Sequence, residues 1–219
     1  MKQKKLINVK QSLLGLLTLL TLAFTICAVA RAYAAPASTS ENIVLAGGCF
    51  WGVQAVFQHT KGVLTATSGY AGGEAVTAEY ETVSTGTTGH AESVKVAYNP
   101  KQITLEQLLS VFFSVAHNPT ELNRQGPDSG TQYRSAVFTT TLEQQQTVET
   151  YIAHLQKTGG YSSPIVTTVE PLKAFYPAED YHQNYARLHP YNPYIMIHDT
   201  PKVTTLKKRL PELYVEPEG

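Results

Sequence analysis

The cysteine in the stretch AGGCFWGVQAVF, Cys49, is the residue best suited to nucleophilic chemistry. The apolar run at residues 43–46 predicts a strand, Gly47 and Gly48 interrupt it, and the apolar residues that follow recur at helical spacing. This order places Cys49 at a strand-to-helix turn, where exposed backbone N–H groups and the helix dipole favour a thiolate. Because a free cysteine is also commonly a small buried apolar residue, the turn by itself leaves both interpretations open.

Glu92, in the stretch GHAESVKV, is the candidate proton donor. It comes just before an alternating run in which Val94 and Val96 predict a half-buried strand. Desolvation at the entrance of that strand would raise the pKa of Glu92, so that its carboxyl could give a proton to a leaving oxygen. The ordinary alternative is a solvated glutamate at a strand end. His90 could act as a base for Cys49, although a turn histidine is more often structural.

Three further polar residues are candidates for the site, and spacing alone assigns a role to none of them. Tyr80 and Tyr133 carry hydroxyls that can donate hydrogen bonds, but most buried tyrosines serve in packing. Asp128 lies in GPDSG, which is typical of a turn.

The elements that would position these residues alternate between strands and helices. Thr104 to Gln107 forms a capping-box start for an apolar helix, and residues 118–132 form a polar loop marked by proline and glycine. Strands are predicted at residues 63–73, 93–100, 133–140 and 165–171, and helices at 49–59, 108–117, 141–158 and 203–210. This order of elements predicts a mixed α/β sandwich in two layers.

The first 34 residues have the layout of a secretory signal peptide: a basic head, an apolar run and a small-residue exit, with cleavage expected after Ala34. The apolar run is also long enough to serve as an uncleaved anchor. We therefore expect export to the periplasm or the extracellular space. The domain boundaries expected are leader 1–34, linker 35–41, catalytic domain 42–200, and C-terminal helix and tail 201–219.

The net charge of the chain without its leader argues against a nucleic-acid-binding function. The full chain is formally neutral, but five of its 17 basic residues and none of its 17 acidic residues lie in the leader, which leaves 12 basic residues and a net charge of −5. An acidic domain is a poor candidate for binding nucleic acid.

Removal of Cys27 with the leader would leave Cys49 as the one cysteine, so no internal disulfide is expected. The histidines lack the spacing of metal ligands, and we expect no metal or organic cofactor.

Several motifs, taken together, resemble the A-type peptide methionine sulfoxide reductases. They are GGCFWG at 47–52, SGYAGG at 68–73, YETVSTGTTGHAE at 80–92, RQGPDSGTQYRS at 124–135 and FYPAEDYHQNY at 175–185. The resemblance covers roughly residues 42–190. It implies an α/β (α+β) fold, a two-layer sandwich with a mixed sheet and a ferredoxin-like core.

The resemblance also implies the chemistry. Cys49 would attack the sulfur of methionine S-sulfoxide, free or in proteins, while Glu92 protonates the oxygen. Methionine would leave, and Cys49 would remain as a sulfenic acid. The family thereby repairs oxidised proteins.

The same resemblance assigns the surrounding residues. Phe50 and Trp51 would form an apolar pocket for the methyl group of the sulfoxide. Tyr80 and Tyr133 would hydrogen-bond the oxygen, and Asp128 would orient the pocket.

The chain departs from many members of this family because residues 50–219 contain no resolving cysteine. We therefore expect a thiol from outside to reduce Cys49, supplied by a thioredoxin- or glutaredoxin-like protein or by a small thiol. The protein is expected to be a monomer.

Two other classes of function stay open. A thiol peroxidase or a Cys/His hydrolase would need a histidine near Cys49, and His90 and His182 are the available ones. A secreted binding module, in which GCFWG merely packs, is the non-enzymatic alternative.

Overall fold

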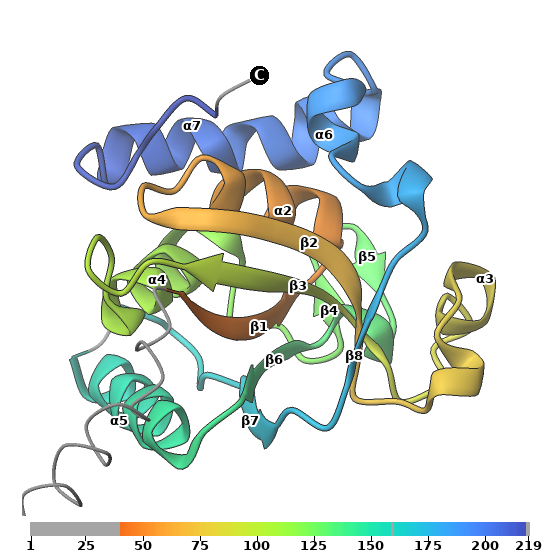
Figure 1. Cartoon of the computed structure of the whole chain (residues 1–219), viewed down its shortest axis with the longest axis horizontal. Helices are drawn as coiled ribbons and strands as arrows, with labels where there is room; N and C mark the ends of the chain where they lie inside the picture. Colours follow the sequence, from red (N-terminus) through yellow and green to blue (C-terminus); the bar gives the residue numbers. More distant parts are fainter. Residues whose placement is uncertain (1–39, 159, 218–219) are drawn as a thin grey trace, which may run out of the picture. The chain divides into compact units, whose positions relative to one another are not determined.

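A six-stranded mixed sheet forms the centre of the protein. The computed structural model describes residues 40–158 and 160–217, and its sheet has the order β7-β6-β1-β3-β2-β8 (Figure 1). Neighbouring strands are antiparallel except for β6 and β7, which are parallel. The strands are β1 (Glu41–Gly47), β2 (Val63–Ala71), β3 (Ala91–Tyr98), β6 (Ser135–Thr139), β7 (Thr168–Pro171) and β8 (Phe175–Pro177).

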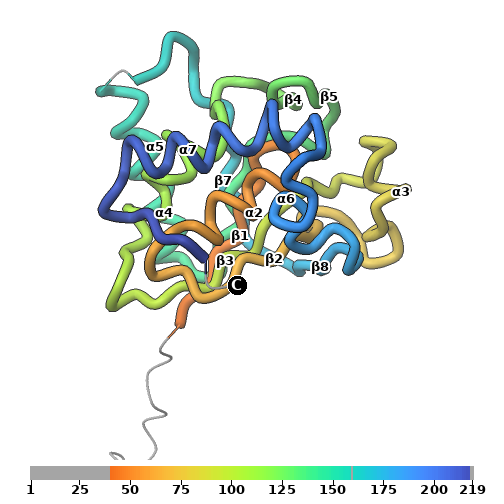
Figure 2. Tube along the Cα trace, turned by 90° about the horizontal axis from the view of Figure 1, so that it is seen from above, coloured from red at the N-terminus to blue at the C-terminus, as the bar shows by residue number. Residues whose placement is uncertain are grey.

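The main core lies between one face of this sheet and four helices. Side chains alternate along a strand, so Ile43 and Leu45 of β1 face the helices together with Val94 and Val96 of β3. The helices are α2 (Phe50–Gln58), α4 (Leu105–Val111), α5 (Leu142–Thr158) and α7 (Thr200–Arg209), and α4 continues into the π-helical turn η2 (Phe112–Ala116). Helix α7 lies alongside α2 (Figures 1 and 2).

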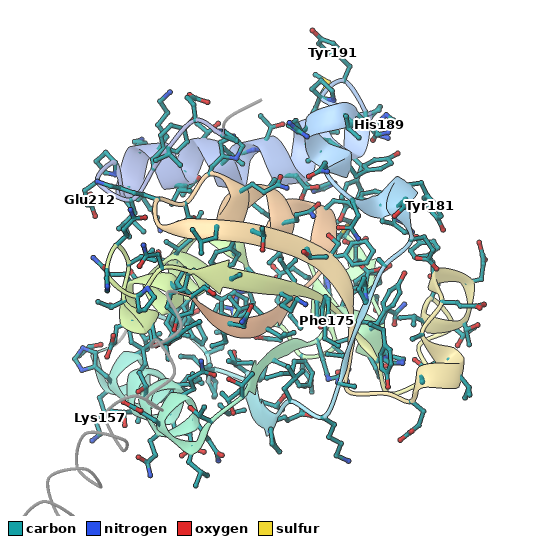
Figure 3. The ribbon with its side chains drawn as sticks, in the orientation of Figure 1. Lys157, Phe175, Tyr181, His189, Tyr191 and Glu212 are labelled. Carbon is teal, nitrogen blue, oxygen red and sulfur yellow. The ribbon has the colours of Figure 1, made fainter. Side chains whose placement is uncertain are left out.

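A smaller apolar cluster covers the opposite face of the sheet. Val44 and Ala46 of β1 belong to it, and Leu172, before β8, and Phe175, at the start of β8, pack against it. Phe175 is labelled in Figure 3. The result is the predicted two-layer α/β arrangement, with the helices on one face only.

Short elements connect the main ones and carry most of the candidate site residues. They are η1 (Ala75–Thr77), α3 (Tyr80–Val83), β4 (Arg124–Gln125), β5 (Asp128–Ser129), η3 (Thr131–Tyr133), η4 (Asp180–His182), α6 (Tyr185–Leu188) and η5 (Ile195–Asp199). The loop predicted at 118–132 therefore contains a small antiparallel hairpin, whose strands β4 and β5 have two residues each.

Local sequence signals account for most of the element boundaries. The capping box at α4 is confirmed: Thr104 Oγ1 accepts from the Gln107 N–H at 3.2 Å, and Gln107 Oε1 accepts from the Thr104 N–H at 2.9 Å. The C-terminal helix begins at Thr200 rather than at Val203, because a proline such as Pro201 is accommodated in the first turn of a helix. Strand β7 begins at Thr168 and is thus shorter than predicted.

The predicted leader, its cleavage after Ala34 and most of the linker lie outside the described residues. In the described ranges 40–158 and 160–217, no helix combines the length and apolar character needed to cross a membrane.

Candidate active site

One cavity of about 220 Å³ brings together all the candidate site residues from the sequence except His90. It is lined by residues from six separate stretches of the chain: Cys49, Phe50, Trp51, Tyr80, Glu92, Asp128, Tyr133 and Tyr194. None of them lines the larger cavity of about 610 Å³ near the start of α5. The geometry thus unites the predicted residues and adds one, Tyr194, that the sequence did not indicate.

Cys49 is the N-cap residue of α2, directly after the β1 strand and Gly48, which has a φ of 91°. Cys49 is 9% exposed and lies at the wall of the cavity. Gly48 can take this left-handed conformation because it has no side chain, and the chain can therefore turn sharply into the helix.

The electrostatic surroundings of Cys49 differ from the expectation of a resting thiolate. Burial raises the pKa of Cys49 well above its ordinary value, and the negative charges of Glu92 and Asp199 raise it further. The Trp51 N–H and the ammonium of Lys202 act in the opposite direction, with smaller effect. Burial and nearby carboxylates therefore outweigh the helix terminus, and the substrate-free site holds a thiol.

Glu92 is the second residue of β3 and shares a face with Val94 and Val96, so its side chain points to the helix side of the sheet. It is 2% exposed, and its Oε2 accepts a hydrogen bond from the Phe50 N–H at 3.0 Å. Burial raises the pKa of Glu92 to about 8, although the Phe50 N–H partly offsets the effect. The carboxyl is therefore largely protonated at neutral pH, as the sequence led us to expect, and it lies next to the first turn of α2.

Tyr80 and Tyr133 supply hydroxyl groups to the same cavity from α3 and η3. Burial raises the pKa of each, so both hydroxyls stay protonated and can donate hydrogen bonds at neutral pH. Glu179 fixes the backbone of Tyr80: its Oε1 accepts from the Tyr80 N–H at 2.9 Å, while its Oε2 accepts from the Tyr70 hydroxyl at 2.7 Å.

Trp51 forms an aromatic wall whose orientation is fixed on three sides. Its Nε1–H donates to His182 Nδ1 at 3.1 Å, the ring of Tyr185 stacks on it with centroids 3.8 Å apart, and Tyr194 meets it edge-on at 6.0 Å. The ring of Phe50 packs in turn against Tyr70 and His182. His182 and Tyr185 come from the FYPAEDYHQNY motif, so that motif supports the indole rather than supplying a base.

Tyr194, which directly precedes η5, and Asp128 of β5 complete the lining of the cavity. The Tyr194 hydroxyl donates a hydrogen bond to Asp128 Oδ2. Tyr194 lies beyond the resembling region, in a stretch without a motif, and this is why sequence reasoning missed it.

His90 lies outside the cavity, and both of its ring nitrogens are occupied. Nδ1 accepts from the Gly73 N–H at 3.2 Å, so Nε2 carries the proton and donates to the Glu74 carbonyl at 3.0 Å. The structural interpretation of this histidine holds, and it cannot serve as a base for Cys49. Among the described residues no group of His, Cys, Asp and Glu has the arrangement of a metal site.

Comparison with known proteins gives a consistent result. The sequence profile described as "Peptide methionine sulfoxide reductase" matches residues 41–213. A relative from Mesorhizobium japonicum, peptide methionine sulfoxide reductase MsrA 2, is 59% identical over 177 residues, which cover 81% of this chain and 91% of the relative. The protein of the same name from Synechocystis is 47% identical and covers 80% of this chain and 83% of the relative.

Solved structures agree with these relatives. Methionine sulfoxide reductase A of Corynebacterium diphtheriae superposes with a TM-score of 0.66 at 36% identity, over 71% of this chain and 78% of that one. Reduced Mxr1 from Saccharomyces cerevisiae gives a TM-score of 0.66 at 36% identity, over 72% of this chain and 90% of that one.

Proposed function

Because the chain belongs to the peptide methionine sulfoxide reductase family, it is an oxidoreductase that reduces methionine sulfoxide with electrons from thiols, and we propose that Cys49 and Glu92 carry out the reaction. The sulfur of Cys49 attacks the electrophilic sulfur of the sulfoxide. Glu92 gives its proton to the sulfoxide oxygen, which cannot leave as a naked anion.

The protons that the reaction needs are both present on Cys49 and Glu92 in the substrate-free site. Cys49 starts as a thiol and Glu92 as a neutral acid. As the sulfur of Cys49 bonds to the sulfoxide sulfur, Glu92 gives its proton to the sulfoxide oxygen. The proton of Cys49 then passes to Glu92 and restores the neutral acid. The sulfur–oxygen bond of the sulfoxide and the new sulfur–sulfur bond then break, and the hydroxyl passes to the sulfur of Cys49. Methionine leaves, and Cys49 ends as a sulfenic acid. Thiol and carboxyl are expected to titrate together.

The two sides of the cavity differ in chemistry, which supports discrimination between the sulfoxide epimers. Phe50 and Trp51 offer an apolar surface to the methyl group, while Tyr80, Tyr133 and Glu92 offer donors to the oxygen. An epimer with oxygen and methyl exchanged would place oxygen against the rings and leave the donors without a partner, at a cost of about 1–3 kcal/mol per unpaired group. We propose the S epimer as the substrate, free or in proteins.

The observation that carries this proposal is the shared cavity of Cys49, Glu92 and Trp51, with the Phe50 N–H joining α2 to Glu92. Turnover of dabsylated methionine sulfoxide, with each epimer separately and dithiothreitol as reductant, tests it. Cys49→Ser should abolish turnover, and Glu92→Gln should lower kcat by roughly a hundredfold or more. Full turnover by Cys49→Ser, or equal use of both epimers, contradicts it.

Regeneration of Cys49 is proposed to need a thiol from outside the chain. Cys49 is the one cysteine of the described residues, and residues 50–219 contain no other. A thioredoxin- or glutaredoxin-like protein or a small thiol would condense with the sulfenic acid, releasing water, and a second thiol would free Cys49 from the mixed disulfide. We further propose that the protein acts as a monomer.

We propose that this repair takes place outside the cytoplasm, because residues 1–34 read as a signal peptide or an uncleaved anchor. Fractionation of cells that produce the full chain, with the N-terminus of the product sequenced, tests this. Recovery of the product in the cytoplasm with residues 1–34 intact contradicts it.

A further inference from the structure

A buried ion pair rests on the first turn of α2, three residues after Cys49. A Cβ atom built on Gly52 would overlap Asp199 Oδ1 and lie 2.7 Å from Lys202 Nζ. Both residues come from the C-terminal segment, in which η5 and α7 contact α2 (Figures 1 and 2). Because Gly52 has no side chain, the carboxylate and the ammonium lie directly against the helix that begins at Cys49.

The pair is well shielded from solvent. Lys202 Nζ lies 3.2 Å from Asp199 Oδ1, and the side chain of Asp199 is completely buried while that of Lys202 is 19% exposed. Asp199 Oδ2 has no hydrogen-bond partner among the described residues. An ion pair held in these surroundings is screened far less than one on the surface.

The pair has a local effect on its own helix as well as a cost. Helix η5 continues into α7 at Asp199 and Thr200, and an i,i+3 pair of an acid and a lysine supports such a helix. Burial of a carboxylate with one oxygen unpartnered costs free energy. The contact with Gly52 also brings both charges against the helix that begins at Cys49, where they can act beyond their own helix.

The charges of the pair act on Cys49 in opposite directions. Asp199 raises the pKa of Cys49, and Lys202 lowers it. The other charged or titratable groups around Cys49 come from separate elements: Glu92 on β3, Asp128 on β5, Tyr80 on α3, Tyr133 on η3 and Tyr194 before η5. His198 also faces Asp199, and His117, which burial keeps neutral by lowering its pKa to about 3, faces Lys202.

We propose that Lys202 is a positioning residue for the reaction: held by Asp199 against the first turn of α2, its ammonium supports Cys49 in the thiolate form. The carboxylate has two effects, since it fixes the lysine and also opposes the thiolate by its own charge. Lys202 therefore offsets the effect of the neighbouring carboxylates on the thiol, without contact with the substrate.

This role rests on the proposed function in two steps, the attack on the sulfoxide and the release of Cys49. In the second step an external thiolate attacks the donor sulfur of the mixed disulfide, a disulfide of two donor thiols forms, and Cys49 leaves as a thiolate. A leaving thiol of lower pKa departs faster. Support from Lys202 would accelerate this release in an enzyme that depends on outside thiols.

Alkylation of Cys49 by iodoacetamide in the substrate-free full chain tests the proposal, because only the thiolate reacts. The modified Cys49 peptide is followed by mass spectrometry, so that Cys27 does not interfere. Lys202→Met alone would leave Asp199 buried without its cation, and Asp199 would then take up a proton. The effect of the lysine is therefore measured in an Asp199→Asn background, in which the amide oxygen can still accept the hydrogen bond that Lys202 Nζ donates and so keep the lysine in place.

Asp199→Asn should react faster than the unmodified protein at neutral pH, because it removes one negative charge near Cys49. Asp199→Asn/Lys202→Met should then react roughly three- to tenfold more slowly than Asp199→Asn, while Asp199→Asn/Lys202→Arg should keep the rate of Asp199→Asn. Lys207→Met is the matched control, since Lys207 lies on the same helix in an exposed pair with Glu216. It should leave the rate unchanged.

Equal rates in Asp199→Asn and Asp199→Asn/Lys202→Met, with both proteins folded by circular dichroism, would overturn the proposal. If Asp199→Asn does not fold, the same comparison is made in Asp199→Ser, and the same outcomes decide. Alkylation does not require sulfoxide turnover. Loss of turnover with the expected difference in alkylation would thus count against the proposed function and still support the role of Lys202.

Discussion

At the scale of single residues, the site holds two groups that are both protonated at neutral pH and must exchange protons during the reaction. Burial raises the pKa of Glu92 to about 8 and raises that of Cys49 as well. Each group in its charged form disfavours the charge of the other. With a sulfoxide bound, the two negative charges need not coexist. The sulfoxide oxygen accepts the proton of Glu92, and Cys49 gives its own proton to Glu92.

The pH dependence of turnover follows from this arrangement. Glu92 must be protonated to act as an acid, so kcat/KM for the sulfoxide should fall as the pH rises through about 8. Initial rates at low sulfoxide concentration, measured with an excess of reductant over the alkaline range, check this. A kcat/KM that rises steadily through this range, with Glu92→Gln retaining the same profile, would contradict the assignment.

The same carboxyl should make stability depend on pH. Its pKa is about 8 in the folded protein and 4.5 in its ordinary state, so its contribution to the free energy of unfolding is fully present below 4.5 and lost as the pH rises through about 8. Glu92→Gln cannot titrate. Urea denaturation across this range should show the stability of Glu92→Gln increasing relative to the unmodified protein as the pH rises, and no relative change would show that Glu92 titrates normally.

Tyr194 permits a test that separates its hydroxyl from its ring. Tyr194→Phe removes the hydrogen bond to Asp128 but keeps the edge-on contact with Trp51, so kcat/KM should fall roughly three- to tenfold, equal to about 0.5–1.5 kcal/mol. Tyr191→Phe is the matched control. Tyr191 is 87% exposed, and Figure 3 shows it projecting away from the ribbon. Equal losses in both variants would contradict a specific role for Tyr194.

Sequence reasoning reached the residues whose motifs carry their chemistry and missed those that act through packing. Cys49, Glu92 and Asp128 stand in recognisable stretches, and the structure brings them to one cavity. Tyr194 and Lys202 lie in a stretch whose local pattern indicates only a turn and a basic helix. Their proximity to Cys49 depends on how the C-terminal segment packs on α2, and a local pattern carries no information on such a contact.

At the scale of elements, the side chain of Gln183 joins the segment before α6 to strand β2. Its Oε1 accepts from the Ser68 N–H at 3.0 Å and from Gln54 Nε2 at 3.0 Å, and its Nε2 donates to the carbonyls of Ser68 and Ala178. The amide thus occupies both backbone groups of Ser68, as a neighbouring strand would. Because His182 is the adjacent residue, this connection also sets the position of the ring that supports Trp51.

Gln183→Ala should therefore reduce both stability and activity. Loss of these hydrogen bonds, with backbone groups left unpartnered, should lower the free energy of unfolding by about 1–3 kcal/mol. Urea denaturation measures this, and kcat/KM should fall with it because Trp51 loses support. Gln145→Ala, at a half-buried position on α5 where the side-chain amide has an exposed hydrogen bond to Glu149, should change neither quantity. A stable and fully active Gln183→Ala would show that the connection is dispensable.

At the scale of the whole molecule, the fold could largely be predicted, since periodicity located the main strands and helices and their order indicated two layers. The sequence did not indicate the order of the strands in the sheet, or that residues 172–175 cover the face opposite the helices. These features depend on contacts between distant segments, such as Leu172 and Phe175 against Val44 and Ala46. Short elements such as β4 and β5 were missed because two residues give no periodic pattern.

The cysteine content of the whole chain gives a further prediction. After one equivalent of sulfoxide and no reductant, the mass of the protein should increase by one oxygen atom, located on the Cys49 peptide, and no intramolecular disulfide should form. Intact-mass and peptide mass spectrometry check this, with Cys27→Ser as the control that should behave identically. A disulfide between Cys27 and Cys49 in the unmodified chain would contradict the requirement for an outside thiol.

The cavity draws its lining from Cys49 at one end of the folded region and from Tyr194 close to the other. Synthesis proceeds from the N-terminus, so Cys49 emerges long before the aromatic and acidic groups that surround it can be present. Until residues near 194 have been made and have docked, the thiol has the properties of an ordinary cysteine in an open chain. Catalytic activity therefore appears only when folding is complete. A product truncated before Tyr194 would contain Cys49 but would lack the complete cavity and would be inactive.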